Sequence, residues 1–384
     1  MTRIMNNTPQ IVIGTNHHNT LGIVKSLGIV GIPVILIVKG RKGFVEKSKY
    51  VTECFYIENA EHCLSILDRI SYDHTEKLIV ISTSDLFTHI LDLNYDKLSQ
   101  KFKIPNCYNK NGEITYFMNK DMQVEIASKI GMNVPYTINY NWDSKIPKPE
   151  KFPIIIKPLK SIGGGKNICI CESQEELELA LSHFDRNYPI QIQKFIKKEY
   201  EIVVLGCAVD GKVIVPGFIR KHRDEKGGTT FSTVYNTDKL QGGLIEKVTC
   251  FIKEIGYTGM WGVEFIFSNN EFYFIEANLR CDATTYSLTV AGVNLPYIYS
   301  MLLEGKEYAS CKSIETMNSM VEFGDIFFLL KRKISFKEWR RDLKSCKIKY
   351  FYDKNDMRPF YAKFCNFIVY LFIKIFYKVG KNTK

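Results

Sequence analysis

Four side chains able to bind a metal ion or a phosphate group lie close together near the ends of two apolar segments. Glu264 lies in residues 262–267, and Glu276, Asn278 and Arg280 lie in residues 274–280. Both segments alternate apolar and polar residues, which predicts two β-strands whose polar groups point to defined faces. Glu276 and Asn278, two residues apart, share a face. Carboxylate and carboxamide oxygens suit Mg²⁺, whose remaining ligands are phosphate oxygens and water.

The turn between these strands decides where Glu264 points. A three-residue loop of Asn269, Asn270 and Glu271 places Glu264 opposite Glu276, whereas a two-residue loop sends it to the other face. Facing carboxylates repel each other unless a cation lies between them. A metal site therefore requires Glu264 to face Glu276. The alternative is a pair of amphipathic strands with solvated outer faces.

A second candidate site combines a lysine with a glycine-rich loop. Residues 154–156 are apolar and lead into Lys157, which Pro158 holds in an extended conformation. The segment 161–166, Ser-Ile-Gly-Gly-Gly-Lys, offers unobstructed backbone N–H groups that can surround phosphate oxygens. The alternative for this loop is a plain hairpin turn.

The elements that must position these residues follow from the apolar periodicity. Strands at 11–14, 33–38 and 78–81 alternate with helices at 19–30 and 61–70, which predicts a parallel sheet. The first turn lacks the GxGxxG spacing of dinucleotide-binding proteins. Further along, Asn119 can cap a helix over 120–130, and Asp210-Gly211 predicts a hairpin turn. The remaining expected elements are strands at 154–157, 190–194, 201–208 and 212–218 and helices at 174–184, 244–255 and 284–303.

The order of these features resembles the ATP-grasp superfamily over residues 10–305. The resemblance implies an α/β (α+β) ATP-grasp fold with an N-terminal Rossmann-like parallel-sheet domain and a basic, helical C-terminal tail. Its layout is similar to that of D-aspartate ligases, other carboxylate–amine ligases and carbamoyl-phosphate-synthase-type enzymes. The expected domains are the Rossmann-like domain, the lid subdomain, the C-terminal ATP-grasp subdomain and a basic extension, over residues 1–108, 109–195, 196–310 and 311–384.

The resemblance also implies a role for each candidate residue. Lys120 and Lys157 would contact the α- and β-phosphates of ATP, and the loop with Ser161, Gly163, Gly164 and Gly165 would cover the β- and γ-phosphates. Lys194 and Ile196 would present backbone groups to adenine, with Phe195 packing nearby and Glu201 on the ribose. Glu264, Glu276 and Asn278 would hold two Mg²⁺ ions, with Mn²⁺ as the alternative ion. Arg280 would contact the transferring phosphoryl group and Arg220 the acyl phosphate.

Three positions depart from the family pattern. Gln193 stands where a glutamate commonly accepts a hydrogen bond from adenine, and Leu279 replaces the usual proline of the Asn-Pro-Arg signature. Glu199 competes with Glu201 for the ribose role. The metal ligands and phosphate-binding lysines remain, so we expect an active enzyme.

The resemblance implies an ADP-forming ligase that activates a small carboxylate as an acyl phosphate, which an amine then attacks to give an amide. The acceptor could be a cell-envelope precursor at the membrane. The alternatives are an ATP-grasp enzyme with another acceptor, such as a carboxylase or thiol ligase, or a non-catalytic nucleotide-binding scaffold. His17, His18 and Asp85 follow parallel strands and could line a substrate pocket. Their alternatives are solvated loop histidines and a helix-capping aspartate.

The net charge of +11 is concentrated at the C-terminus, where residues 331–384 carry 16 Lys and Arg against 4 Asp and Glu. Residues 360–377 predict an amphipathic helix with a polar stripe that includes Lys363 and Lys374. An anionic membrane surface is therefore an expected partner. The alternatives are packing on the domain or on a second subunit, which would form a homodimer. No nucleic-acid-binding module accompanies the basic run, so nucleic acid is not an expected partner.

The eleven cysteines lack CxxC spacing, and several lie in apolar runs. Buried reduced thiols are the expected state, which indicates a cytoplasmic protein, peripheral on the inner face of the membrane if the tail binds lipid.

Overall fold

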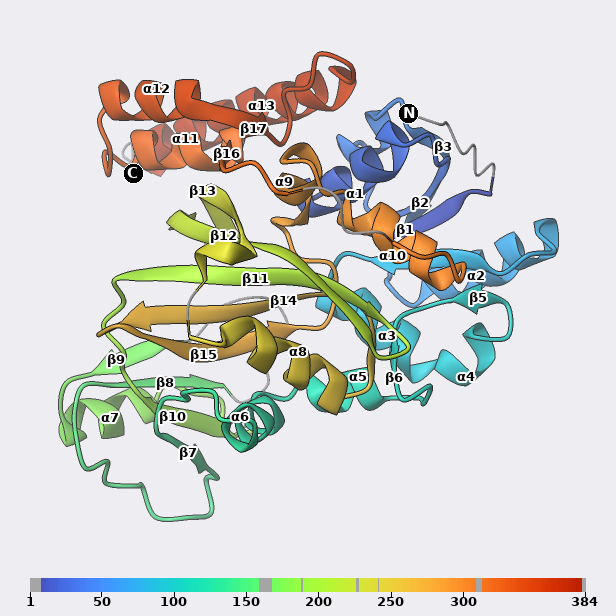
Figure 1. The fold of residues 1–384 in the computed structure, drawn as a ribbon. Coiled ribbons are helices and arrows are strands. Elements are labelled where there is room, and N and C mark those ends of the chain that lie inside the picture. The colour runs from blue at the N-terminus through green and yellow to red at the C-terminus, as the bar shows by residue number, and fades with distance from the viewer. Residues whose placement is uncertain are drawn as a thin grey trace.

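The computed structural model describes residues 8–158, 168–187, 189–225, 228–240, 242–308 and 313–381. Three sheets organise this part of the chain. Figure 1 shows the N-terminal sheet, in blue, and a four-stranded sheet, in green, on opposite sides of a large central sheet. The predicted α/β fold class is confirmed.

The N-terminal sheet has five parallel strands in the order β3-β2-β1-β4-β5, as the βα alternation predicts. Sequence reasoning missed β3, an edge strand in which only one of seven residues is buried. The elements of this part are β1 (Gln10–Thr15), α1 (His18–Ile29), β2 (Val34–Lys39), η1 (Val45–Lys47), β3 (Val51–Ile57), α2 (His62–Asp73), β4 (Leu78–Ser82), α3 (Asp85–Leu93), α4 (Tyr95–Leu98) and β5 (Phe102–Lys103).

The four-stranded sheet is antiparallel, with the order β7-β10-β8-β9. The helix beginning at Lys120 is confirmed, although Asn119 makes no side-chain capping bond and donates instead to the Tyr116 carbonyl. The elements from here to the large sheet are β6 (Asn106–Cys107), α5 (Glu113–Phe117), α6 (Lys120–Lys129), β7 (Thr137–Tyr140), β8 (Ile154–Pro158), β9 (Cys169–Cys171), α7 (Gln174–Leu181) and β10 (Ile190–Lys194).

The large sheet has the order β15-β14-β11-β12-β13-β16-β17, with β6 pairing β14. The predicted helix over 284–303 is two helices, because Gly292 adopts a left-handed conformation and Asn294 caps the second. The elements are β11 (Tyr200–Val209), β12 (Lys212–Glu225), β13 (Gly228–Asn236), η2 (Thr237–Lys239), α8 (Leu244–Glu254), β14 (Tyr257–Ser268), β15 (Glu271–Asn278), α9 (Thr285–Val290), α10 (Leu295–Leu303), β16 (Met317–Met320), α11 (Glu322–Leu330), α12 (Phe336–Ser345), β17 (Cys346–Lys349) and α13 (Arg358–Lys381).

The β14–β15 hairpin brings Glu264 opposite Glu276, as the metal-site interpretation requires, but by a different route. The loop has two residues, Asn269 and Asn270, both with positive φ, rather than three. The register shifts between Glu264 and Phe265, and Ile275 is the extra residue on β15. This β-bulge returns the carboxylates to one face, because one inserted residue reverses the alternation.

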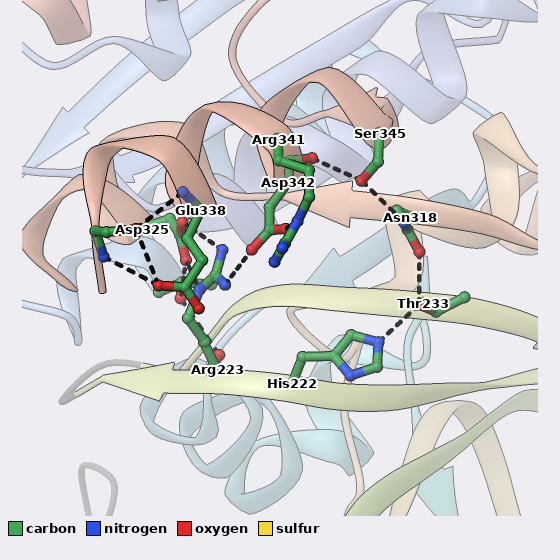
Figure 2. Close-up of polar contacts among 11 residues, drawn as sticks. His222, Arg223, Thr233, Asn318, Asp325, Glu338, Arg341, Asp342 and Ser345 are labelled. Carbon is green, nitrogen blue, oxygen red and sulfur yellow. Dashed lines mark hydrogen bonds and ion pairs between the residues drawn. The ribbon is translucent and has the colours of Figure 1, made fainter. Parts of the chain in front are cut away.

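The C-terminal extension is built into the large sheet rather than appended to it. Strand β16 pairs with β13, and β17 continues the sheet parallel to β16. Figure 2 shows the polar contacts that hold helices α11 and α12 against β12, centred on Arg223. Its guanidinium donates two hydrogen bonds of 2.8 Å to Asp325 and one of 2.6 Å to Asp342. The domain boundaries given above remain a prediction.

Helix α13 lies against the protein, which supports packing on the domain. Phe367 is buried, and its ring lies near those of Phe323 and Phe327. Lys363, predicted to lie in an outward polar stripe, points inward over the rings of Phe44 and Phe351. Within the described residues, no helix is long and apolar enough to cross a bilayer. The described cysteines are free thiols, as expected.

Candidate active site

A cavity of about 340 Å³ lies between the four-stranded sheet and the large sheet. Its walls come from α6, β8, β10, β14 and β15, together with the start of α3. The cavity therefore brings together nine predicted site residues: Lys120, Lys157, Lys194, Phe195, Ile196, Glu201, Glu276, Asn278 and Arg280. Apolar side chains, including Ile155, Ile168, Ile266 and Leu279, line the rest, as suits a slot for a flat ring.

Of the two facing carboxylates, Glu276 lines the cavity, and Glu264 lies opposite it on β14. Glu264 accepts hydrogen bonds from Lys221, at 2.7 Å, and from the Asn278 amide, at 3.2 Å. Glu276 lies 3.4 Å from the Lys120 ammonium. Burial raises the pKa of Glu264 to about 7, with Glu276 adding to the rise and Lys221 opposing it. Burial also raises the pKa of Glu276, but three lysines together hold it below its ordinary value. Glu264 therefore takes up a proton more readily than Glu276 does.

Lys157 is the buried cation of the site. Its side chain is 7% exposed, and its ammonium donates to the Gln193 carboxamide at 3.1 Å. Burial lowers the pKa of Lys157 to about 8, with Lys120 adding to the effect and Glu276 opposing it. Gln193 also donates to Thr137. Because Gln193 stands in place of the usual glutamate, Lys157 has a neutral partner instead of a carboxylate with which it would form an ion pair.

Lys221 is the site residue that sequence reasoning missed. It lies 2.7 Å from Glu264 and 3.6 Å from Glu201, and its side chain is 12% exposed. Burial alone lowers the pKa of Lys221, but Glu264 and Glu201 outweigh it and raise the pKa above its ordinary value. The sequence signal for Lys221 is the alternation of side chains along β12, which places adjacent basic residues on opposite faces of the sheet.

Arg220 lies on the other face. It pairs with Ile202 in the sheet, whereas Lys221 pairs with Glu201. Its guanidinium stacks over the Tyr200 ring at 4.1 Å from the ring centroid. The structure does not bring Arg220 to the cavity, so its predicted contact with an acyl phosphate has no geometric support. The register with β11 decides this placement.

The ribose alternatives separate clearly. Glu201 lines the cavity, where Lys198 and Lys221 outweigh the effect of burial and lower its pKa. Glu199 accepts a hydrogen bond from the Asn269 backbone N–H and so holds the β14–β15 turn. Of these two carboxylates, Glu201 lines the cavity and Glu199 does not, which favours Glu201 for the ribose role.

The segment from Lys194 to Ile196 forms one wall of the cavity. The Lys194 backbone N–H donates to the Tyr136 carbonyl, and the Phe195 N–H donates to the Pro153 carbonyl. Both acceptors directly precede strands of the four-stranded sheet, so these bonds hold the segment to that sheet. The contacts with adenine themselves remain a prediction.

Arg280 lies where the cavity meets the N-terminal sheet. Its Nε donates to Asp85 at 2.6 Å, and Nη2 donates to Asn278 at 3.2 Å. Asp85 lies at the start of α3 and lines the cavity, whereas the helix cap is Ser84. Asp85 thus joins the site, as the pocket interpretation suggests, and His17 is instead the N-cap of α1.

The predicted loop residues Ser161, Gly163, Gly164 and Gly165 lie outside the described residues. Their role toward the β- and γ-phosphates stays a prediction. The described ends of this connection are Pro158 and Ile168, and Ile168 lines the cavity.

The donor set fits Mg²⁺ held jointly with phosphates. Glu264, Glu276 and Asn278 offer oxygen atoms on one face, and an added cation would relieve the raised pKa of Glu264. Within the described ranges, no group of three His, Cys, Asp or Glu side chains could hold a metal ion alone. Mg²⁺ commonly binds through one or two carboxylates plus substrate phosphates, so this set suits an ion that arrives with a nucleotide.

A larger cavity, of about 630 Å³, lies beside Tyr200 and Phe267 on the other face of the large sheet. Its charged lining is Lys239, Lys247 and Glu271, with no pair of facing carboxylates. Because charge and geometry identify chemistry better than size does, we assign the site to the smaller cavity.

The two sheets closing over a lysine- and carboxylate-lined cavity define an ATP-grasp architecture. Residues 118–284 match the family model of the ATP-grasp domain, and this part of the chain is an ATP-grasp domain. The chain is 29% identical over 170 residues to the carbamoyl phosphate synthase large chain of Clostridium beijerinckii, covering 41% of this chain. It is 28% identical over 177 residues to the D-alanine–D-alanine ligase of Fusobacterium nucleatum, covering 44% of this chain.

The chain spans only 15% of the length of that synthase and 59% of that ligase. Among solved structures, N5-carboxyaminoimidazole synthetase from Staphylococcus aureus has a TM-score of 0.65 at 15% identity, with 87% of each chain covered. The L-amino acid ligase from Bacillus licheniformis has a TM-score of 0.64 at 14% identity, covering 82% of this chain and 80% of that one. These likenesses establish the fold.

Proposed function

We propose that this chain is an ATP- and Mg²⁺-dependent ligase that joins a carboxylate to an amine with release of ADP. The observation that carries the proposal is the facing pair Glu264 and Glu276, with Asn278 beside them and lysines on three sides. An excess of carboxylate oxygens next to lysines is the arrangement that a metal-bound polyphosphate requires. The ligase names of two relatives support this reaction class.

Each described side chain has a task in this reaction. Lys120 and Lys157 would neutralise the α- and β-phosphates, and Glu201 would accept from the ribose hydroxyls. Glu264, Glu276 and Asn278 would hold Mg²⁺, which supplies charge neutralisation at the phosphate oxygens. Arg280, directed by Asp85, would face the transferring phosphoryl group.

The proposed reaction has two steps. A substrate carboxylate oxygen attacks the γ-phosphorus, the bond to the β-phosphate oxygen breaks, and ADP leaves with that electron pair. The amine nitrogen then attacks the acyl carbon, and phosphate leaves as the amine releases a proton. The protein positions both substrates and keeps water from the acyl phosphate.

The alternatives use the same ATP site. A carboxylase or thiol ligase would present a different acceptor to the same acyl or carboxy phosphate, and a scaffold would bind nucleotide without turnover.

The test is ADP and phosphate release from ATP, Mg²⁺ and a panel of carboxylates and amines. Glu276→Gln should lower kcat by about two to three orders of magnitude. The variant lacks one charged ligand of the Mg²⁺ that would neutralise the negative charge developing on the phosphoryl group. Glu271→Gln, on the same strand but at the exposed turn, is the matched control. Release of AMP instead of ADP would overturn the acyl-phosphate route, and silence across the panel would favour the scaffold.

We also propose that the basic extension contacts an anionic membrane surface. Exposed Phe336 at the start of α12 lies among basic residues of 331–349, and Tyr361 and Val369 on α13 are exposed as well. Reversing three charges on α12, at Lys337, Arg340 and Lys344, should abolish co-sedimentation with phosphatidylglycerol vesicles. Equal binding to neutral phosphatidylcholine vesicles would contradict an electrostatic contact. Homodimer formation and a cytoplasmic location remain predictions.

A further inference from the structure

One carboxylate that lines the cavity has an oxygen atom left for a ligand. Three carboxylates line it, Asp85, Glu201 and Glu276, and the proposed function assigns the last two to the ribose and to Mg²⁺. Asp85 accepts a hydrogen bond of 2.6 Å from the Arg280 Nε through Oδ1, whereas its Oδ2 bonds to no group in the described parts of the chain. Because the Asp85 side chain is 30% exposed, a small molecule in the cavity can reach this oxygen.

Hydrogen bonds connect Asp85 to a predicted metal ligand. The Arg280 guanidinium donates to Asp85 through Nε and, at 3.2 Å, to the Asn278 carboxamide through Nη2. Arg280 therefore lies between Asp85 and Asn278. The proposed function places the γ-phosphate at the metal, so a second substrate that attacks the acyl phosphate must bind close to this point. Asp85 is the cavity carboxylate next to Arg280, and its Oδ2 is available to that substrate.

The N-terminal sheet brings Asp85 to the cavity. Asp85 is the first residue of α3, and two residues separate it from the end of β4. Strands β1 and β4 are neighbours at the point where the strand order reverses. Because α/β sheets bind ligands outside the carboxyl ends of their strands at such a point, this is where a substrate contact from the N-terminal domain is expected.

We infer that Asp85 binds the amine substrate in its cationic form, with the ammonium group donating a hydrogen bond to Oδ2. The inference rests on the proposed function and selects among its acceptors. A carboxylate attracts an ammonium group, whereas it repels a thiolate and does not attract an uncharged nucleophile. The ammonium group releases one proton to water before it attacks the acyl carbon. It releases a second proton as phosphate leaves with the electron pair of the broken C–O bond.

Two substitutions separate amine binding from the contact between Asp85 and Arg280. Asp85→Asn removes the charge but keeps a carbonyl oxygen that can accept from the Arg280 Nε. Two further acceptors of Arg280, Asn278 and the Cys281 carbonyl at 3.2 Å, stay in place. Asp85→Ala removes the charge and the acceptor together. We therefore expect Asp85→Asn to weaken amine binding alone, and Asp85→Ala to impair phosphoryl transfer as well.

The kinetic test compares two nucleophiles of the same size near neutral pH, with the carboxylate that gives the most ADP in the panel above. Ethylamine is then a cation, whereas O-methylhydroxylamine is uncharged. Asp85→Asn should raise KM for ethylamine about ten- to a hundredfold, because a charge-assisted hydrogen bond is lost. KM for O-methylhydroxylamine and for ATP should change by less than about threefold, since neither contact depends on this charge. Glu175→Gln removes an exposed carboxylate from the first turn of α7, outside the cavity, and is the matched control.

The products, identified by mass spectrometry, separate this inference from the proposed function. The wild type should form both the ethylamide and the O-methylhydroxamate, with ADP. An equal rise of both KM values in Asp85→Asn would overturn the inference and leave Asp85 as a positioning residue for Arg280. Formation of the O-methylhydroxamate without any ethylamide would overturn it too, while retaining the acyl phosphate. Absence of ADP and of both products would refute the ligase, and the inference with it.

Discussion

Two basic residues lie two positions apart on β12 and take part in two different clusters of charged side chains. Arg223 donates two hydrogen bonds to Asp325 and a third to Asp342. Asp325 is fully buried and also accepts a hydrogen bond from Thr230. Lys221 lies between Glu264 and Glu201, and Glu201 lines the cavity of the candidate site. In the first cluster donors match acceptors and no solvent reaches Asp325. In the second, the carboxylate side chains are 21% and 23% exposed, and the pKa of Glu264 is raised.

Charge balance and access to a cavity distinguish a structural ion cluster from a binding site built of the same residue types. A buried ion pair that satisfies every donor and acceptor has no capacity for a ligand. A cluster with facing carboxylates, one of them with a raised pKa, and an adjacent cavity has such capacity. Figure 2 shows the closed cluster, which holds the C-terminal extension on the sheet.

Breaking the closed cluster should have the largest effect. Arg223→Met leaves Asp325 as a buried carboxylate without its charge partner, so the free energy of unfolding should fall by about 3–5 kcal/mol. Urea denaturation without nucleotide measures it. Arg341→Met, which removes an arginine with 71% exposure beside Asp342, should cost less than about 1 kcal/mol. Equal losses in the two variants would show that the cluster is not closed.

Lys221→Met should lower activity more than stability, in contrast to Arg223→Met. Removing the cation between Glu264 and Glu201 should lower kcat/KM for ADP release about a hundredfold, because phosphate charge loses a nearby positive group. The unfolding free energy should change less than in Arg223→Met, since Glu264 can take up a proton. Arg220→Leu, the adjacent residue on the other face, is the matched control and should stay within about threefold of the wild type. A larger loss in Arg220→Leu than in Lys221→Met would restore Arg220 as the catalytic candidate.

The pH dependence of MgATP affinity gives the smallest and most graded test. Below about pH 7 Glu264 takes up a proton that Mg²⁺ must displace, and above about pH 8 Lys157 loses the proton that phosphate requires. The dissociation constant should therefore be lowest between these values and rise up to about tenfold per pH unit on either side. Calorimetric titration from pH 6 to 9.5 measures it. Lys157→Arg should remove the alkaline rise alone, and a rise that persists in this variant would assign it to another group.

The sequence alone determined those features that depend on local spacing. The alternation of residues 274–278 places Glu276 and Asn278 on one face, and Asp210-Gly211 forms the predicted hairpin turn with positive φ at both residues. The βα alternation predicted a parallel N-terminal sheet, and Lys120 begins its helix as expected. The ordered set of these motifs was sufficient to indicate the ATP-grasp fold.

The relations between separate segments depend on tertiary contacts that no local pattern specifies. The bulge at Ile275, not the length of the turn, brings Glu264 to Glu276, and the register with β11 places Lys221 rather than Arg220 beside Glu201 and Glu264. The inward position of Lys363 depends on contacts with Phe44, more than 300 residues away in the sequence. A periodic pattern fixes which residues of one element share a face, but the direction of that face is set by long-range packing, register and burial.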